Sequence, residues 1–447
     1  MILSNRTTLP STVLLALMIG FMTSNLSVAT VIAQEAHVAE HPTNSASWEQ
    51  ARLQHSRLPE DDIWWTVNGK DMLWNFKNLH QLFPTVNVYR SGAIAELEAA
   101  PDSRLRDFEI DVDGTQTTLS RFIHSDRSTV MGLIVLHKGR VVFESYPRMQ
   151  AYEAPIYWSV AKVFPGLLVR ILEERGQLDV SKPVDFYLDE LSSSALAGVT
   201  VRNLLDMASG LDCGDEYESR DSCYYQYSIA IGDGHWTKGD PLDPYEFLTT
   251  LQAERVAEQG QTYSYSGVNT FVLSWLVEKI TGLNFQDVLA REVWSKIGAE
   301  ANGSFIAPNK GVAMTHGGFL SRLRDLARFG ALYTPSYKSV SSTQVISDAH
   351  IELLLDGGRP QLMATSESRF PGFKHNVYQW DAVLNDGTLY KGGWAGQGLI
   401  VNPTWDVVAV YTGYFKDDSY SEEPLLPHIM KALKETYGTQ NATALGK

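Results

Sequence analysis

A serine and a lysine in one apolar stretch are the first residues of this chain whose types and spacing suggest chemistry. Ser159 and Lys162 lie three residues apart in "IYWSVAKVFPGLLVRIL". On a helix this spacing places both side chains on one face, so that the hydroxyl and the amine can meet. Burial disfavours the ammonium form, and a neutral lysine can take the serine proton. The pair predicts a nucleophile with its base. The alternative is a helix-capping serine beside a solvent-facing lysine, since about one S-x-x-K match is expected by chance in a chain of this length.

Two later segments carry groups that would complete such a site. In "GQTYSYSGVNTFVLSWLVEKITG", Tyr265 and Asn269 lie in a polar Ser/Gly loop just before a long amphipathic helix, and a tyrosine there can relay protons. In "YKGGWAGQG", Lys391 supplies positive charge within a glycine-rich strand that a substrate can approach closely. Backbone N–H groups of that strand, together with that of Ser159, can form an oxyanion hole.

The order S-x-x-K, Y-x-x-x-N, K-x-G over residues 125–415 resembles that of the serine β-lactamase and penicillin-binding superfamily. Within the superfamily, the chain is similar to the esterase and amidase branch typified by 6-aminohexanoate-dimer hydrolase, which is related to class C β-lactamases. The segments "GLIVLHKGRVVFESY", "VTVRNLLDMASGL" and "GGFLSRLRDLARFG" carry the resemblance as well. It implies that Ser159 is the nucleophile, Lys162 its base and Tyr265 the proton donor to the leaving group.

The resemblance also implies substrate-binding roles on the late strand. Lys391 and Gly393 occupy the place of the superfamily's Lys-Thr-Gly strand, which makes the Trp394 N–H the second oxyanion donor. In an alternative register, with "WAG" as the triad, that donor is Gln397. Gly392 replaces a hydroxyl residue that helps to bind the carboxylate of a β-lactam, which weakens a penicillin substrate.

The role of Asn269 and a possible second catalytic arrangement stay open on sequence alone. Asn269 can contact substrate or cap the following helix. Asp206 and His316 suggest a Ser-His-Asp triad, but nothing in the sequence links them to Ser159 and the chain has no G-x-S-x-G nucleophile elbow. We therefore expect His316 to be structural.

The chain has two cysteines, Cys213 and Cys223, in "LDCGDEYESRDSCYY". We expect a disulfide, with two buried thiols as the alternative, and no metal site, because two cysteines without a nearby histidine offer too few ligands. The acidic residues between them, among them Asp215, Glu216 and Asp221, either attract a cationic substrate or form a solvated loop, the second being the expected case.

Composition and the N-terminus bear on partners and location. A net charge of -15 and a pI near 5.2 argue against nucleic-acid binding. The first 33 residues carry one charge, Arg6, and the apolar run "STVLLALMIGFM", which predicts a signal peptide cut after Ala33 and a periplasmic or secreted protein. A retained N-terminal anchor is the alternative, and no later stretch is apolar enough to span a membrane.

The distribution of patterns predicts the fold class and domain organisation. Residues 130–146 read as a β-hairpin, about 180–355 as helices and long loops, and residues 388–414 as two or three further strands, so that strands return only near the C-terminus. The helix after Ser159 reads as interrupted at Pro165-Gly166. We predict an α/β (α+β) fold whose antiparallel sheet is built from N- and C-terminal segments, flanked by helices, with an inserted mainly helical region. The expected divisions are a signal peptide (1–33), an N-terminal lead-in and extension (34–100) and a serine hydrolase domain (101–447).

Together these features predict an exported serine hydrolase that cleaves a small ester, amide or peptide through an acyl-enzyme and needs no cofactor. The alternatives are a penicillin-binding or peptidoglycan-sensing module of the same fold that does not turn over, and a true β-lactamase or D-amino-acid peptidase. The same machinery serves all of these substrates, so the motifs define the chemistry and the walls of the pocket define the substrate.

Overall fold

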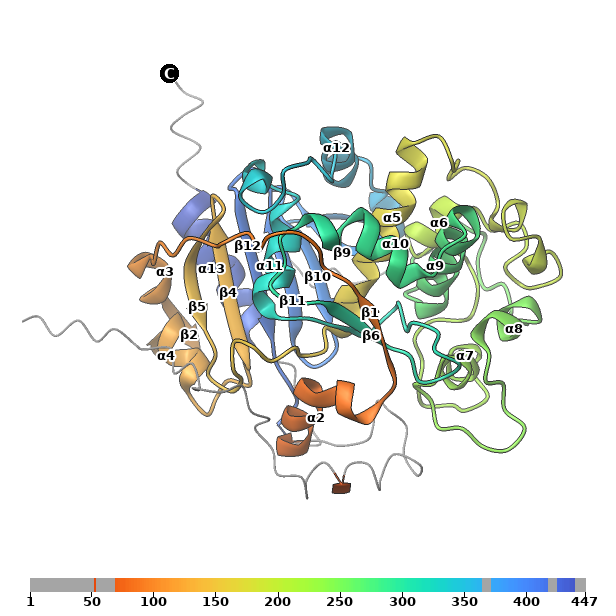
Figure 1. Ribbon diagram of the computed structural model, residues 1–447, viewed down its shortest axis with the longest axis horizontal. Helices are drawn as coiled ribbons and strands as arrows, with labels where there is room; N and C mark the ends of the chain where they lie inside the picture. Colours follow the sequence, from red (N-terminus) through yellow and green to blue (C-terminus); the bar gives the residue numbers. More distant parts are fainter. Residues whose placement is uncertain (1–51, 54–68, 364–370, 417–423, 439–447) are drawn as a thin grey trace, which may run out of the picture. The chain divides into compact units, whose positions relative to one another are not determined.

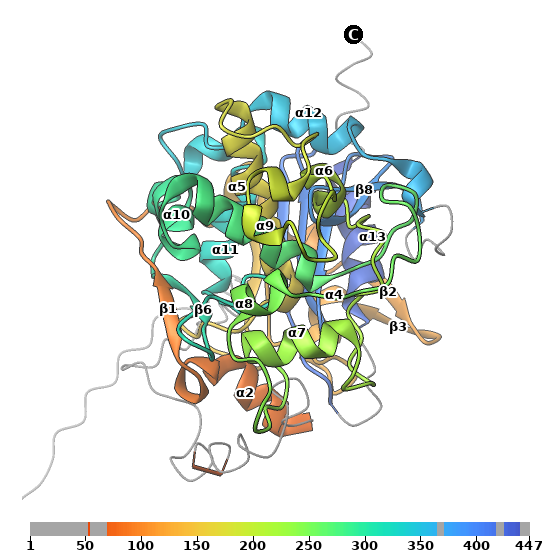
Figure 2. The same cartoon turned by 90° about the vertical axis from the view of Figure 1, so that its right-hand side faces the viewer.

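The central sheet joins strands from residues 132–145 to strands from residues 373–412. The computed structural model describes residues 52–53, 69–363, 371–416 and 424–438, so the expected signal peptide and most of the lead-in lie outside the described residues. Within the described residues, seven antiparallel strands lie in the order β5-β4-β12-β11-β10-β9-β8 (Figure 1; β8 is labelled in Figure 2). They are β4 (Gly132–His137), β5 (Arg140–Ser145), β8 (Phe373–Val377), β9 (Trp380–Leu384), β10 (Leu389–Gly393), β11 (Gln397–Asn402) and β12 (Val407–Thr412). The predicted hairpin and the predicted sheet built from both ends are confirmed.

Alternation along the strands gives each face of this sheet its own apolar core. In β4, Ile134 and Leu136 belong to one buried cluster, whereas Leu133 and Val135 belong to the other. The first cluster includes helices α5 (Val163–Glu174), α9 (Gly267–Thr281) and α11 (Leu323–Ala331). The second includes α3 (Ser103–Arg106), α4 (Leu119–His124) and α13 (Leu425–Tyr437) (Figure 1). Burial on both faces explains why the central strands are apolar almost throughout.

The inserted region between β5 and β8 is mainly helical, as predicted, but it also contains strands (Figure 2). β6 (Gly303–Ile306) pairs with β7 (Phe319–Leu320) and with β1 (Thr85–Val88) from the predicted N-terminal extension. The expectation that strands return only near the C-terminus is therefore wrong. These strands have at most four residues and pair with a distant segment, so no local periodicity marks them.

The remaining elements complete the described part of the chain. They are α2 (Gly69–Leu82), β2 (Glu109–Val112), β3 (Thr115–Thr118), η2 (Trp158–Lys162), η3 (Val184–Phe186), η4 (Asp189–Leu191), α6 (Val201–Leu205), α7 (Cys223–Ile231), α8 (Pro244–Thr249), α10 (Phe285–Glu292), η5 (Trp294–Lys296), η6 (Pro335–Ser339), α12 (Asp348–Asp356) and η7 (Pro360–Met363). Among the described residues, no helix combines the length and the apolarity needed to cross a membrane.

The helix after the serine is continuous, so the interruption predicted at Pro165-Gly166 is wrong. α5 begins at Val163 and runs through both residues to Glu174. Pro165 lies in the first turn, where a backbone N–H has no partner within the helix and its absence costs little. The change of geometry lies earlier, where the 3₁₀ turn η2 passes into α5.

An aromatic cluster packs around the first turn of α5. The Phe164 ring lies 4.6 Å from that of Phe319 and 4.8 Å from that of Phe329, measured between centroids. We expect Phe164→Ala to lower the free energy of unfolding by about 3–5 kcal/mol, because it removes a fully buried ring. Phe186→Ala is the matched control: this ring is 65% exposed, and its loss should change stability by no more than about 0.5 kcal/mol. Urea denaturation followed by tryptophan fluorescence measures both, and equal losses would contradict the prediction.

Candidate active site

A 3₁₀ turn places the serine and the lysine directly in line. Both belong to η2, and side chains at i and i+3 eclipse in a 3₁₀ turn. The Lys162 Nζ donates a hydrogen bond of 3.0 Å to Ser159 Oγ. Trp158, just before the serine, has a φ of 46°, which costs a bulky residue on the order of 1–3 kcal/mol. Its ring packs against those of Phe76 and Trp394, at centroid distances of 5.5 and 5.6 Å, and this packing holds the strained turn.

Lys162 is buried, and its partners offset only part of the cost of removing its ammonium group from water. Its side chain is 1% exposed, its Nζ donates to the carbonyl oxygen of His316 at 2.9 Å, and the Asp215 carboxylate lies 3.7 Å away. Burial lowers the pKa of Lys162 to about 8; Asp215 opposes this shift and Lys391 adds to it. An amine with this pKa is partly neutral near neutral pH and can accept the proton of the serine.

Tyr265 lies between two lysines. The Nζ atoms of Lys162 and Lys391 are each 4.7 Å from the centre of its ring, and Lys391 Nζ donates to its hydroxyl oxygen at 3.0 Å. Burial raises the pKa of Tyr265 well above its usual value, and the carboxylates of Asp381 and Asp215 raise it further. The phenol therefore stays protonated and is suited to donate a proton.

Asp381 is a residue of this site that the sequence analysis did not identify. It lies on β9, and its carboxylate binds Lys391 Nζ at 2.5 Å and accepts from the Gly392 N–H at 2.9 Å. Burial lowers the pKa of Lys391 and Asp381 raises it. A single acid in the apolar strand "WDAVL" was the signal that could have found it, because an acid in a buried strand needs a partner.

The end of β10 passes close to the turn that carries the serine. A side chain at Gly393 would collide with the carbonyl oxygen of Tyr157, two residues before Ser159. Trp394 follows, and its carbonyl accepts from Gln397 Nε2 at 3.0 Å. Gln397 is buried and also bonds the backbone of Gly413, so its side chain braces the turn after β10.

Asn269 is buried in the first turn of α9, and its amide faces the Met207 sulfur at 3.8 Å. The N-cap of this helix is Ser266, so the capping interpretation of Asn269 is wrong. Its predicted contact with substrate stays a prediction.

The Ser-His-Asp alternative finds no geometric support. The two ring nitrogens of His316 bond to Tyr227 (2.9 Å) and Asp233 (3.2 Å), and burial keeps the pKa of His316 well below its usual value. Asp206 instead pairs with two arginines, Arg202 and Arg359. His316 serves the site through its backbone carbonyl, which no side-chain pattern could reveal.

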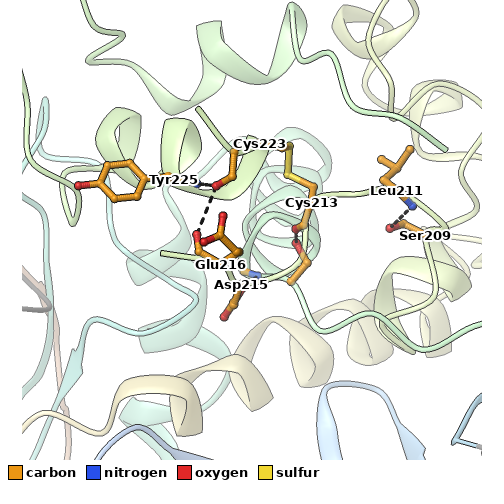
Figure 3. The surroundings of a disulfide bond; sticks show 10 residues. Ser209, Leu211, Cys213, Asp215, Glu216, Cys223 and Tyr225 are labelled. Carbon is orange, nitrogen blue, oxygen red and sulfur yellow. Dashed lines mark hydrogen bonds between the residues drawn. A yellow bond between two sulfur atoms is a disulfide. The ribbon is translucent and has the colours of Figure 1, made fainter. Parts of the chain in front are cut away.

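The predicted disulfide between Cys213 and Cys223 is present, and it closes the acidic loop (Figure 3). The solvated-loop expectation is wrong for Asp215, whose side chain is 17% exposed and faces Lys162. It holds for Asp221, which is exposed. Glu216 accepts from the Ser219 N–H at 2.9 Å and so shapes the loop itself.

An antiparallel sheet combined with a serine–lysine turn that faces a glycine-rich strand is typical of serine hydrolases of the β-lactamase type. The comparisons agree: the Beta-lactamase family profile matches residues 116–418, and the chain belongs to this family.

Three relatives illustrate the likeness. The chain is 30% identical over 351 residues to the 6-aminohexanoate-dimer hydrolase of Paenarthrobacter ureafaciens, a match that covers 77% of this chain and 86% of the relative. A solved structure from Bacillus anthracis, provisionally named as a 6-aminohexanoate-dimer hydrolase, has a TM-score of 0.70 at 22% identity and covers 83% of this chain and 95% of its own. EstCE1, a hydrolase with promiscuous acyltransferase activity, has a TM-score of 0.54 at 18% identity over 70% of this chain and 96% of its own. The two structures support the fold alone.

The close approach of β10 to the serine turn gives a test within the site. We expect Gly393→Ala to lower kcat/KM for a p-nitrophenyl ester by about 100-fold or more, because a new methyl group would push the strand from the Tyr157 carbonyl. Gly392→Ala is the control, since its nearest obstacle is the hydroxyl end of the Tyr390 side chain, which can move. If both variants lost the same activity, the strand's approach would not be the cause.

Proposed function

We propose that this protein is an exported serine hydrolase that cleaves an ester or amide bond through an acyl-enzyme on Ser159, with Lys162 and Tyr265 as its proton-transfer partners. The observation that carries the proposal is the 3.0 Å hydrogen bond between Lys162 and the Ser159 hydroxyl, formed by a lysine whose pKa is lowered to about 8. Such a lysine activates the serine without a histidine.

Acylation follows from this geometry. Ser159 Oγ forms a bond with the substrate's carbonyl carbon, and the hydroxyl proton passes to the neutral Nζ of Lys162. The carbonyl π bond breaks, and the negative charge on its oxygen is stabilised by the backbone N–H groups of Ser159 and Trp394. The position of Gly393 against Tyr157 supports this assignment of Trp394, because it brings the next residue of the strand beside the serine turn.

Tyr265 is suited to the second proton transfer. Its phenol donates its proton to the leaving oxygen or nitrogen as the bond to the acyl carbon breaks, and the ammonium of Lys162 then returns a proton to the phenolate. Lys391 supports this step because its hydrogen bond to the Tyr265 oxygen stabilises the developing negative charge. Lys162 is neutral again and can take a proton from the water that releases the acid.

The proposed substrates are small linear esters and amides. The name of the Paenarthrobacter ureafaciens relative favours amides of ω-amino acids as one candidate. Lys391 is fully buried and paired with Asp381, and Gly392 offers no hydroxyl, so this strand is poorly equipped to bind a substrate carboxylate. Both features disfavour β-lactams.

Export is the remaining part of the proposal. It rests on the charge-poor, apolar pattern of residues 1–33 and on the Cys213–Cys223 disulfide, which persists in oxidising compartments.

The nucleophile is tested by Ser159→Ala. We expect kcat for a p-nitrophenyl ester to fall by at least about 10⁴-fold, and labelling by a fluorophosphonate probe to disappear, because the covalent step is lost. The melting temperature of the variant serves as the folding control. Near-normal turnover by folded Ser159→Ala would sink the assignment.

The proton-transfer residues are tested by Lys162→Ala and Tyr265→Phe. Each should lower kcat by about 10²–10⁴-fold while the protein stays folded. Tyr263→Phe is the matched control, since its ring lies 6.4 Å from that of Tyr265 between centroids, in the same segment. A silent Tyr265→Phe combined with an inactive Tyr263→Phe would move the relay to Tyr263.

A further inference from the structure

The loop that begins at the disulfide is hydrogen-bonded along the segment that carries the candidate proton donor. The Asp215 N–H donates to the carbonyl oxygen of Tyr265 at 2.9 Å, and Ser266 Oγ donates to the carbonyl oxygen of Cys213 at 2.6 Å. The Gly267 N–H donates to Asp215 Oδ1 at 2.6 Å. These three bonds hold the two segments side by side at the start of α9.

The other carboxylate oxygen of Asp215 faces the serine's lysine. Asp215 Oδ2 lies 3.7 Å from Lys162 Nζ, and the Asp215 side chain is largely buried. The disulfide fixes the loop two residues before Asp215, because Cys213 is bonded to Cys223 at the start of α7 (Figure 3). The backbone of Asp215 is therefore held from both sides, by the disulfide and by the Tyr265 segment.

We propose that Asp215 is a positioning residue of this hydrolase: its carboxylate, fixed by the disulfide loop and the Gly267 amide, holds Lys162 at the serine and sets the pH above which Lys162 accepts the serine proton. The proposal rests on the proposed function, in which Lys162 is the base. In this proposal, the Cys213–Cys223 disulfide helps to position Asp215 beside Lys162.

The other carboxylates near Lys162 are paired with other side chains. Asp381 on β9 pairs with Lys391, and Asp233 bonds to the ring of His316, which is neutral. Tyr265 stays protonated. Asp215 is the carboxylate that opposes the burial of Lys162 most strongly, ahead of Asp381 and Asp233, whereas Lys391 acts with burial to lower the pKa of Lys162.

The charge of Asp215 acts on the protonation of Lys162. Negative charge on Asp215 favours the ammonium of Lys162, so neutralising Asp215 lowers the pKa of Lys162 below its value of about 8. Since the neutral amine is the active form, kcat/KM then reaches its plateau at a lower pH. A residue that only held the loop in place would change the height of the pH profile and leave its acidic limb where it was.

The test compares pH profiles of kcat/KM for a p-nitrophenyl ester in the wild type, Asp215→Asn and Asp221→Asn, each normalised to the fraction labelled by a fluorophosphonate probe. The asparagine keeps an oxygen that can accept the Gly267 N–H and removes the charge. We expect the acidic limb of the wild type near pH 8 to move down by about 1 pH unit or more in Asp215→Asn. Asp221→Asn changes an exposed acid of the same loop and should leave the limb in place.

Each outcome decides the proposal. Normal labelling with an unmoved limb in Asp215→Asn overturns it and leaves the serine hydrolase assignment intact, whereas full activity of Ser159→Ala overturns that assignment itself. Asp215→Ser is measured in parallel as a second neutral variant, and one folded variant with the shifted limb supports the proposal. If neither neutral variant folds, Asp215 has a structural role and the proposal is overturned.

Discussion

The site depends on the burial of two lysine ammonium groups around one tyrosine ring. Lys162 and Lys391 are 1% and 0% exposed, and removing an ion from water costs several kcal/mol unless partners replace the water. The partners of the two lysines offset this cost unequally. Lys391 has a carboxylate at 2.5 Å, whereas the carboxylate nearest to Lys162 lies at 3.7 Å and a backbone carbonyl supplies its shorter contact. This difference leaves Lys162 the better candidate for a base and Lys391 the better candidate for a permanent charge.

The fold supplies this arrangement from five separate parts of the chain. The 3₁₀ turn carries Ser159 and Lys162 into the start of α5, and the inserted region contributes Tyr265, the disulfide loop and the His316 carbonyl. β9 and β10 bring Asp381 and Lys391 from the C-terminal part, and the pairing of β12 with β4 ties that part to the hairpin before the serine. The geometry of the candidate site therefore depends on these distant pairings, and so on the whole sheet rather than on one motif.

The sequence predicted what local patterns encode. The hairpin, the helix after Ser159 and the late strands follow from periodicity and turn residues, and the order of three motifs pointed to the family. Non-local features could not be predicted. The paired strands β1 and β6, for example, have four residues each and lie more than two hundred residues apart. The pairings of Asp381 with Lys391 and of Asp215 with Lys162 were not predicted for the same reason, because an acid's partner is set by a strand neighbour or a loop crossing that no window of sequence contains. Pro165 misled because its effect depends on its distance from the helix start, which the 3₁₀ turn displaced to Val163.

Hydrogen-bond direction at Tyr265 explains why the unequal pairing of the two lysines matters for the proposed mechanism. Lys391 donates to the phenol oxygen, so the phenol's own proton must point toward another acceptor. If Lys391 were neutral, its nitrogen could accept that proton and draw the donor away from the leaving group. In the proposed mechanism, Asp381 favours the charged form of Lys391 and so helps to orient the tyrosine proton, while the looser pairing of Lys162 allows that lysine to change charge during the reaction. In this proposal, two carboxylates at different distances thus give two chemically identical amines different roles.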